Sequence, residues 1–149
     1  MQKPLHLRIY RKVFFNFMIF NPVLIIVAFF LREAGLRTNK YLESVKASNY
    51  FFSAILILFL LVAIIFKFSR SKFRMIRDEE AKLIAYRQFF VMKMWVYLCL
   101  SLIISLVYVL SGNYFFLYFA IFEFLLFLLD FPFKARVKRD LGDENIFFV

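Results

Sequence analysis

The sequence is poor in the residues that build most catalytic and metal sites. It has one cysteine and one histidine among 149 residues. A single cysteine excludes a disulfide or a multi-cysteine metal site within one chain. A single histidine excludes the usual zinc sites and the commonest catalytic acid–base. There is also no glycine-rich phosphate loop and no recognisable serine triad. We therefore expect a protein that is not an enzyme and that carries no cofactor.

Glycine and proline are also scarce, with three of each. Sandwich and barrel folds need many turns, so this composition disfavours them. A membrane-spanning barrel further requires strands of about 10 residues with alternating apolar and polar positions, and the sequence lacks that alternation. Helices are the remaining way to satisfy backbone hydrogen bonds in hydrocarbon. The sequence predicts an all-α protein.

Apolar residues, by contrast, are abundant. They make up 64% of the chain, which contains 24 phenylalanines and has a mean hydropathy of +0.76. Soluble domains are typically about 45–50% apolar. A soluble fold of this size would expose apolar patches far above the few hundred Å² that soluble monomers tolerate. We therefore expect an integral membrane protein.

Four apolar runs are long enough to cross the roughly 30 Å hydrocarbon core, which takes about 20 helical residues. They are residues 13–31, 50–66, 94–110 and 114–131. Only the turn-forming residues Ser111–Asn113 separate the last two. The sequence predicts one membrane domain, 1–149, with four transmembrane helices arranged as two antiparallel hairpins.

The first run contains a proline and lies close to the N-terminus. Pro22 removes one helical hydrogen bond and disfavours helix at Asn21, so we expect a single crossing with a kink. Signal peptides have apolar cores of about 7–15 residues followed by a small-residue cleavage site. The first run is longer than this and ends in "FFLREAG". We therefore expect it to be retained.

Twenty basic residues define the expected orientation. In a four-span chain the N-terminal segment, residues 67–93 and the tail 132–149 share one side, with sixteen basic residues against four on the other. The positive-inside rule then places both termini in the cytoplasm. This loop charge fits a bacterial cytoplasmic (inner) membrane. Because the basic residues flank the apolar runs, they favour binding of anionic lipid headgroups over nucleic acid.

Residues 67–93 have neither glycine nor proline, and their apolar side chains recur at helical spacing. Asp78, followed by two glutamates, has the pattern of a helix N-cap with acids in the first turn. We expect the second helix to continue to about Met75 and a new helix of roughly 33 residues to begin after Asp78. Helices 2 and 3 would then extend as a basic cytoplasmic hairpin, because roughly 33 residues span about 50 Å.

Four polar residues lie at the predicted bilayer centre. Glu123 is at the middle of the fourth run, eleven residues after Gly112, and Ser101 is eleven residues before it. Ser105 is one helical turn from Ser101, and Asn21 is at the centre of the first run. A charge at this depth costs about 2.5–3.5 kcal/mol even on lenient scales. These four residues are the candidate intramembrane site.

Two interpretations of Glu123 compete. In the structural one, a protonated Glu123 donates a hydrogen bond to Ser101, Asn21 or a partner subunit. In the functional one, it exchanges a proton or binds a cation during transport. Transport sites need polar lining, unwound backbone and flexible hinges, of which the sequence has little, so the structural interpretation is favoured. Asp130, at the cytoplasmic end, is expected to reach headgroups.

Together these patterns predict a small, non-enzymatic polytopic membrane protein. We expect it to act as a subunit or accessory of a membrane complex or homo-oligomer. Its expected partners are anionic lipid headgroups and other membrane subunits or further copies of itself. The alternative is a small proton- or cation-coupled transporter or channel that uses Glu123.

Overall fold

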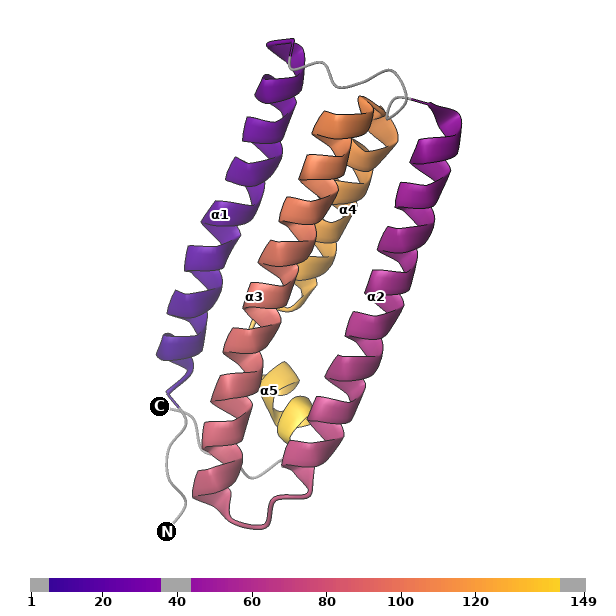
Figure 1. Cartoon of the computed structure of the whole chain (residues 1–149). Helices are drawn as coiled ribbons and strands as arrows, with labels where there is room; N and C mark the ends of the chain where they lie inside the picture. The colour runs from indigo at the N-terminus through magenta and orange to yellow at the C-terminus, as the bar shows by residue number, and fades with distance from the viewer. Residues whose placement is uncertain (1–5, 36–43, 143–149) are drawn as a thin grey trace.

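The structure is a computed structural model that describes residues 6–35 and 44–142. In these residues it contains five helices and no strand, which confirms the all-α prediction for this part of the chain. The helices are α1 (Leu7–Glu33), α2 (Val45–Arg74), α3 (Glu79–Ser111), α4 (Tyr114–Leu129) and α5 (Lys134–Leu141) (Figure 1).

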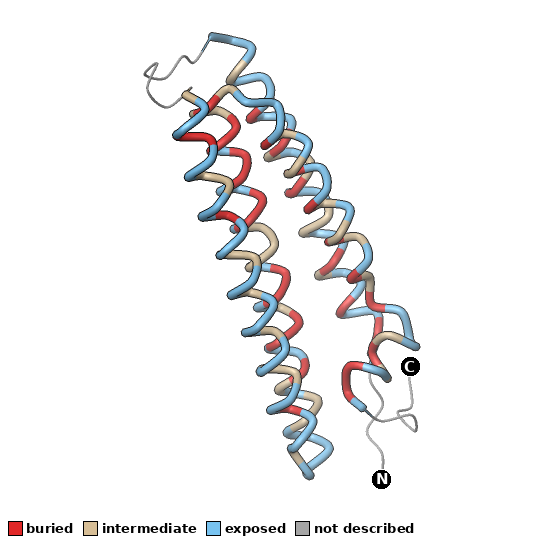
Figure 2. Tube along the Cα trace, turned by 90° about the vertical axis from the view of Figure 1, so that its right-hand side faces the viewer, coloured by how far each residue is buried: buried red, intermediate tan, exposed pale blue. Residues whose placement is uncertain are grey.

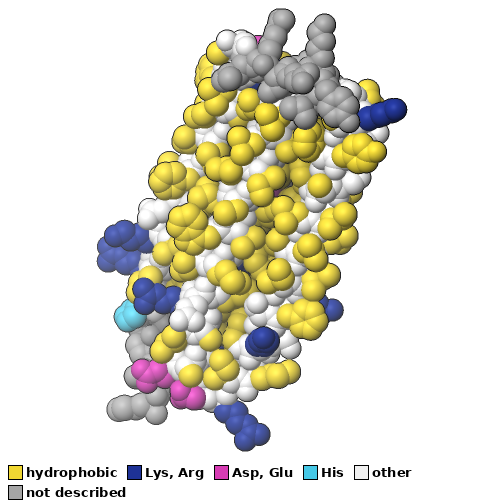
Figure 3. Space-filling model, viewed as in Figure 1, with side chains coloured by type: hydrophobic (Ala, Val, Ile, Leu, Met, Phe, Trp, Pro, Cys, Tyr) yellow, Lys and Arg dark blue, Asp and Glu magenta, His cyan; other side chains and the backbone are white. Residues whose placement is uncertain are grey.

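The four long helices lie side by side, and the short α5 lies near one end of them (Figure 1). At this end are the start of α1, the α2–α3 connection and α5. These are the three segments that the sequence singles out as basic, and we call it the basic end. Figure 3 shows lysine and arginine side chains mostly toward this end, next to a broad apolar surface.

The core lies among α1, α3 and α4, each of which packs against the other two. Buried residues recur on the inward faces of these helices (Figure 2). By contrast, α2 packs chiefly against α3. In the most apolar 18-residue stretch of α2 only 11% is buried, against 44% in that of α3. Most of the apolar surface of α2 therefore faces outward.

Helices α1, α2 and α3 are each long and apolar enough to cross a membrane. Helix α4 has only 16 residues and ends at Leu129, two residues before the predicted end of the fourth span. Taken with α5, from which it is bent by 84°, it gives a fourth candidate span. Pro132 follows this helix closely and cannot continue it. Three to four such helices indicate an integral membrane protein.

Local hydrogen bonds account for the ends of α3. Oδ2 of Asp78 accepts from the backbone N–H of Ala81 at 3.0 Å, so the predicted N-cap and helix start are confirmed. The helix has 33 residues, as predicted. It ends at Gly112, whose φ of +64° belongs to the left-handed region that favours glycine. Asn113 then caps α4 by accepting from the N–H of Phe115 at 3.0 Å.

Helix α1 continues through Pro22 as one helix, which confirms the expected continuity, and the expected kink stays a prediction. Because Pro22 has no N–H, the carbonyl of Met18 receives no hydrogen bond from that position. Met18 lies about one helical turn before Asn21, which belongs to the candidate site described below.

Candidate functional site

All four predicted intramembrane residues are buried inside the bundle. Asn21 on α1, Ser101 on α3 and Glu123 on α4 are 0% exposed, and Ser105 on α3 is 6% exposed. They come from the three helices that pack against one another. We call these four residues the polar layer.

Contacts on the basic side of the polar layer fix the register of the helices. The rings of Phe17 and Trp95 lie 5.2 Å apart, and those of Tyr97 and Phe127 lie 5.6 Å apart. Asn21 is one helical turn beyond Phe17. In the same way, Ser101 is one turn beyond Tyr97, and Glu123 is one turn before Phe127. Asn21, Ser101 and Glu123 therefore each stand roughly 6 Å further from the basic end than one of these contacts, and Ser105 lies one turn beyond Ser101.

Contacts at the far end agree with this register. Nη1 of Arg32 donates to the backbone oxygen of Val109 at 3.3 Å, and the rings of Tyr108 and Tyr114 lie 5.8 Å apart. Both contacts lie about two turns or more beyond Asn21, Ser101 and Glu123, and about one turn beyond Ser105. The equal depth that counting from Gly112 predicts is thus supported independently on both sides.

Two apolar clusters enclose the polar layer. The cluster toward the basic end includes Phe14, Met94 and Phe127, with the rings of Phe14 and Phe127 stacked at 4.7 Å. The cluster toward the far end includes Ile104 and Ala120. Along the bundle axis the polar layer therefore lies between two groups of almost fully buried apolar side chains.

The polar atoms of the layer have no hydrogen-bond partner in the structure. This holds for both carboxylate oxygens of Glu123, both amide atoms of Asn21 and the hydroxyls of Ser101 and Ser105. The expected hydrogen bond from Glu123 to Ser101 or Asn21 is therefore not formed. Counting residues fixes height along the axis, but it does not fix the rotation of each helix, which decides how far apart side chains are. The alternative, a hydrogen bond from Glu123 to a partner subunit, stays a prediction.

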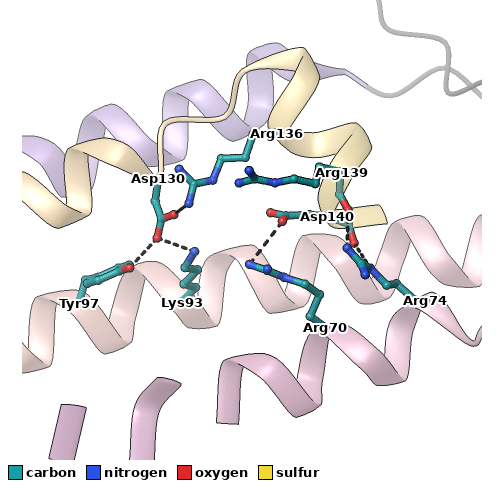
Figure 4. Close-up of polar contacts among 8 residues, drawn as sticks. All are labelled: Arg70, Arg74, Lys93, Tyr97, Asp130, Arg136, Arg139 and Asp140. Carbon is teal, nitrogen blue, oxygen red and sulfur yellow. Dashed lines mark hydrogen bonds and ion pairs between the residues drawn. The ribbon is translucent and has the colours of Figure 1, made fainter. Parts of the chain in front are cut away.

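A second polar cluster, at the basic end, centres on Asp130 (Figure 4). Its Oδ2 lies 2.5 Å from Nζ of Lys93 and accepts from the hydroxyl of Tyr97 at 2.5 Å. Its Oδ1 pairs with the guanidinium of Arg136. The side chain of Asp130 is only 4% exposed, so the prediction that it reaches headgroups is wrong. The bend after α4 turns the chain back and places Arg136 over the acid, which sequence spacing cannot show.

Helix α5 attaches to α2 through the same region. Nη2 of Arg70 lies 3.3 Å from Oδ1 of Asp140, and Nε of Arg74 donates to the backbone oxygen of Asp140 at 2.9 Å (Figure 4). Basic side chains at a helix C-terminus are stabilised by the helix dipole and can donate hydrogen bonds to the unpaired carbonyl oxygens there. Val137 and Leu141 are 0% exposed and pack against the bundle. The four-residue spacing of these two apolar residues was the available sequence signal for α5.

Neither cluster has the composition of a catalytic centre. Within residues 6–35 and 44–142 there is no group of three or more His, Cys, Asp or Glu side chains that could hold a metal ion. Cys99 is exposed on α3. What the polar layer offers is a set of buried oxygen atoms with one acid. What the basic end offers is a buried ion-pair network that holds α5 against α2 and α3.

The fold defines the class to which the protein belongs: an all-α chain with three to four helices long and apolar enough to span a membrane. No protein-family model, no curated protein and no solved structure matches this chain.

Proposed function

We propose that the protein is a four-span subunit of a cytoplasmic-type membrane, with its basic end in the cytoplasm. It acts without catalysis, as an accessory in a membrane complex or homo-oligomer. The observation that carries this proposal is a set of exposed apolar side chains on parts of α2 and α3 that extend beyond the hydrocarbon.

The extent of these parts follows from the polar layer, taken as the bilayer centre. Half of a roughly 30 Å hydrocarbon core is about ten helical residues. On α3, the residues before about 90 then lie outside the hydrocarbon core, toward the basic end. On α2, Phe73 packs against Tyr86 with ring centroids 5.7 Å apart, so residues after about 70 lie at similar depth.

Apolar side chains in this region face away from the protein. Met75 is 77% exposed and Ile84 is 54% exposed. Nearby is a groove of about 550 Å³ that combines apolar and basic side chains. Its lining residues are Ser69, Lys72, Phe73, Ile76, Ala85, Gln88, Phe89 and Met92. Exposed apolar patches with polar rims mark interaction sites, and methionine adapts well to a partner. A partner polypeptide at this hairpin would cover them.

The alternative, transport through Glu123, has less support. A transport site needs a polar route and irregular backbone near the membrane centre. In the described residues the polar layer lies in three continuous helices and is enclosed by apolar clusters. The unpartnered acid favours ion binding, whereas the continuous helices and the apolar clusters give less support to transport.

The experiment that tests the proposal compares matched charge insertions. Ile84→Glu places a charge on the exposed hairpin surface, and Ile9→Glu places one on α1, also near the basic end, where Ile9 is 44% exposed. Size-exclusion chromatography with light scattering in mild detergent measures the mass of the purified assembly. We expect the unmodified chain to elute as a complex larger than a monomer.

We expect Ile84→Glu to reduce the complex fraction by about tenfold, and Ile9→Glu to preserve it. A chain that is monomeric in mild detergent and co-purifies with no other polypeptide would overturn the proposal. Equal loss in both variants would assign the effect to charge insertion in general and would also count against it.

A further inference from the structure

The polar layer contains more oxygen atoms than the bundle satisfies. Four side chains from three helices contribute six buried polar atoms without a hydrogen-bond partner. Native interiors leave few such atoms, and those that remain point to a bound ion, to water or to a functional role. Since all four residues are 0–6% exposed, bulk solvent does not satisfy these groups.

The two serines of the layer differ from other serines of the chain. The hydroxyl of Ser53 donates to the carbonyl of Asn49 at 3.0 Å, and that of Ser111 donates to the carbonyl of Val107 at 2.7 Å. This bond to the preceding turn is the usual local partner of a helical serine. Ser101 and Ser105 do not form it. Their hydroxyls are therefore available to a ligand.

The backbone of α1 adds one more acceptor. The carbonyl of Met18 receives no hydrogen bond from Pro22, because proline has no N–H. Met18 packs at the edge of the apolar cluster on the basic side, one turn before Asn21. A backbone oxygen of the kind that coordinates hard cations therefore lies about one helical turn from Asn21 along α1.

An ionised Glu123 would be an unbalanced charge in this layer. Glu123 is its only ionisable residue, and no ion pair involves it. The nearest cation along α3 toward the basic end is Lys93, which is eight residues before Ser101 and is held 2.5 Å from Asp130. No side chain of the layer can neutralise a carboxylate at Glu123.

We propose that the polar layer binds one hard monovalent cation of the Na⁺ class. The carboxylate of Glu123 supplies the counter-charge, and Oδ1 of Asn21 and the hydroxyls of Ser101 and Ser105 supply neutral oxygen ligands. Oxygen donors without nitrogen or sulfur select hard cations over transition metals. A single carboxylate balances a monovalent ion, whereas a divalent ion would leave a net positive charge in hydrocarbon.

This site goes beyond the proposed function. A resident cation would join α1, α3 and α4 through one common ligand, in place of the direct hydrogen bonds that these side chains do not make. It would act inside the chain, whereas the accessory role depends on the exposed hairpin. Each proposal can therefore fail while the other stands.

Thermal unfolding of the purified full-length chain in detergent tests the cation site. Melting is followed by intrinsic fluorescence in NaCl, KCl or choline chloride at constant ionic strength and pH. A ligand at about 100-fold its Kd raises the midpoint by about 5–10 °C in a chain of this size. We expect such a rise in NaCl over choline chloride for the unmodified chain.

Three variants locate the effect. Glu123→Gln keeps the shape of the side chain but removes its charge, and Ser101→Ala removes one ligand from the layer. We expect the first to abolish the Na⁺-dependent rise and the second to reduce it by at least half. Ser53→Ala, on the exposed side of α2, is the matched control and should keep the full rise. If Glu123→Gln does not fold, Ser101→Ala and Ser53→Ala still decide the question.

The proposal is overturned if the unmodified chain melts at the same temperature in NaCl and choline chloride. It is also overturned if the rise persists in full in Ser101→Ala and in any folded Glu123→Gln, because the ion would then bind elsewhere. Stabilisation by acid alone, without any cation dependence, would show that the layer holds only a proton and would equally exclude the cation.

Discussion

Lys93 and Asp130 form a buried ion pair that joins α3 to the residue that ends α4. Nζ of Lys93 lies 2.5 Å from Oδ2 of Asp130, and the two side chains are 8% and 4% exposed. Arg136 of α5 pairs with the other carboxylate oxygen. One acid thus connects three segments of the chain at the basic end. Asp130 pairs with two cations, whereas Lys93 pairs with one acid in the described residues.

The first prediction follows from this asymmetry. Asp130→Asn removes the acid that pairs with Lys93 in the described part of the chain and leaves that buried ammonium uncompensated. We expect a loss of about 3–5 kcal/mol in the free energy of unfolding. Lys93→Met should cost about half as much or less, because Asp130 keeps Arg136. Thermal unfolding in detergent measures both losses.

Lys72→Met is the control for these substitutions, because Lys72 is exposed and removing its charge should change stability by no more than about 0.5 kcal/mol. Equal losses in Asp130→Asn and Lys93→Met would contradict the role assigned to Arg136.

The second prediction compares two glycines with nearly the same backbone conformation. Gly112 and Gly142 have φ values of +64° and +66°. An added Cβ at Gly142 would meet Arg74 no closer than 3.6 Å, an ordinary contact, whereas at Gly112 it would collide with the guanidinium of Arg32. Gly142→Ala should therefore cost about 1–2 kcal/mol from backbone strain alone.

Gly112→Ala should cost more, because Arg32 must also leave its position beside Val109. Thermal unfolding of both variants gives the difference. Equal losses would mean that the arginine moves aside freely and that it does not contribute to holding α1 against the α3–α4 connection.

The third prediction concerns orientation. In a Cys99→Ser background, single cysteines are introduced by Arg77→Cys, at the basic end, and by Lys46→Cys, at the start of α2. A maleimide that cannot cross the membrane should label the second in intact cells and the first only after permeabilisation. The expectation rests on the positive-inside rule and the concentration of basic residues near Arg77.

Labelling of both cysteines in intact cells would contradict the proposed topology, because it would place the two ends of α2 on one side. Exclusive labelling of the Arg77→Cys variant would reverse the orientation.

Local sequence was sufficient for the helix ends that side chains cap. Asp78 and Asn113 each accept a hydrogen bond from an N–H within three residues, and Gly112 supplies a conformation that other residues rarely adopt. The sequence predicted the Asp78 cap and a turn at residues 111–113, because both depend on neighbours along the chain; the caps at Gly112 and Asn113 were found in the structure.

The sequence predicted the level of the candidate site along the helices, but not which of its side chains contact one another. Counting from Gly112 placed Glu123 level with Ser101, and the register of the aromatic contacts supports it. The expected hydrogen bond between them depends on the rotation of each helix and on the rotamers, which sequence spacing leaves open. Asp130 was misjudged for a related reason: its partner Arg136 reaches it only because the chain turns by 84° between α4 and α5.

By itself, the sequence determined that this protein is helical and rich enough in long apolar segments to indicate a membrane. Composition and helical periodicity are properties of the chain and of near neighbours along it, so they can be read without the folded structure. Only the tertiary structure decided that α2 packs chiefly against α3, outside the group of α1, α3 and α4, that α5 folds back against α2, and that four polar residues are buried among the helices. These outcomes depend on which helix faces pack together, and that choice is made by the fit of side chains distant in sequence.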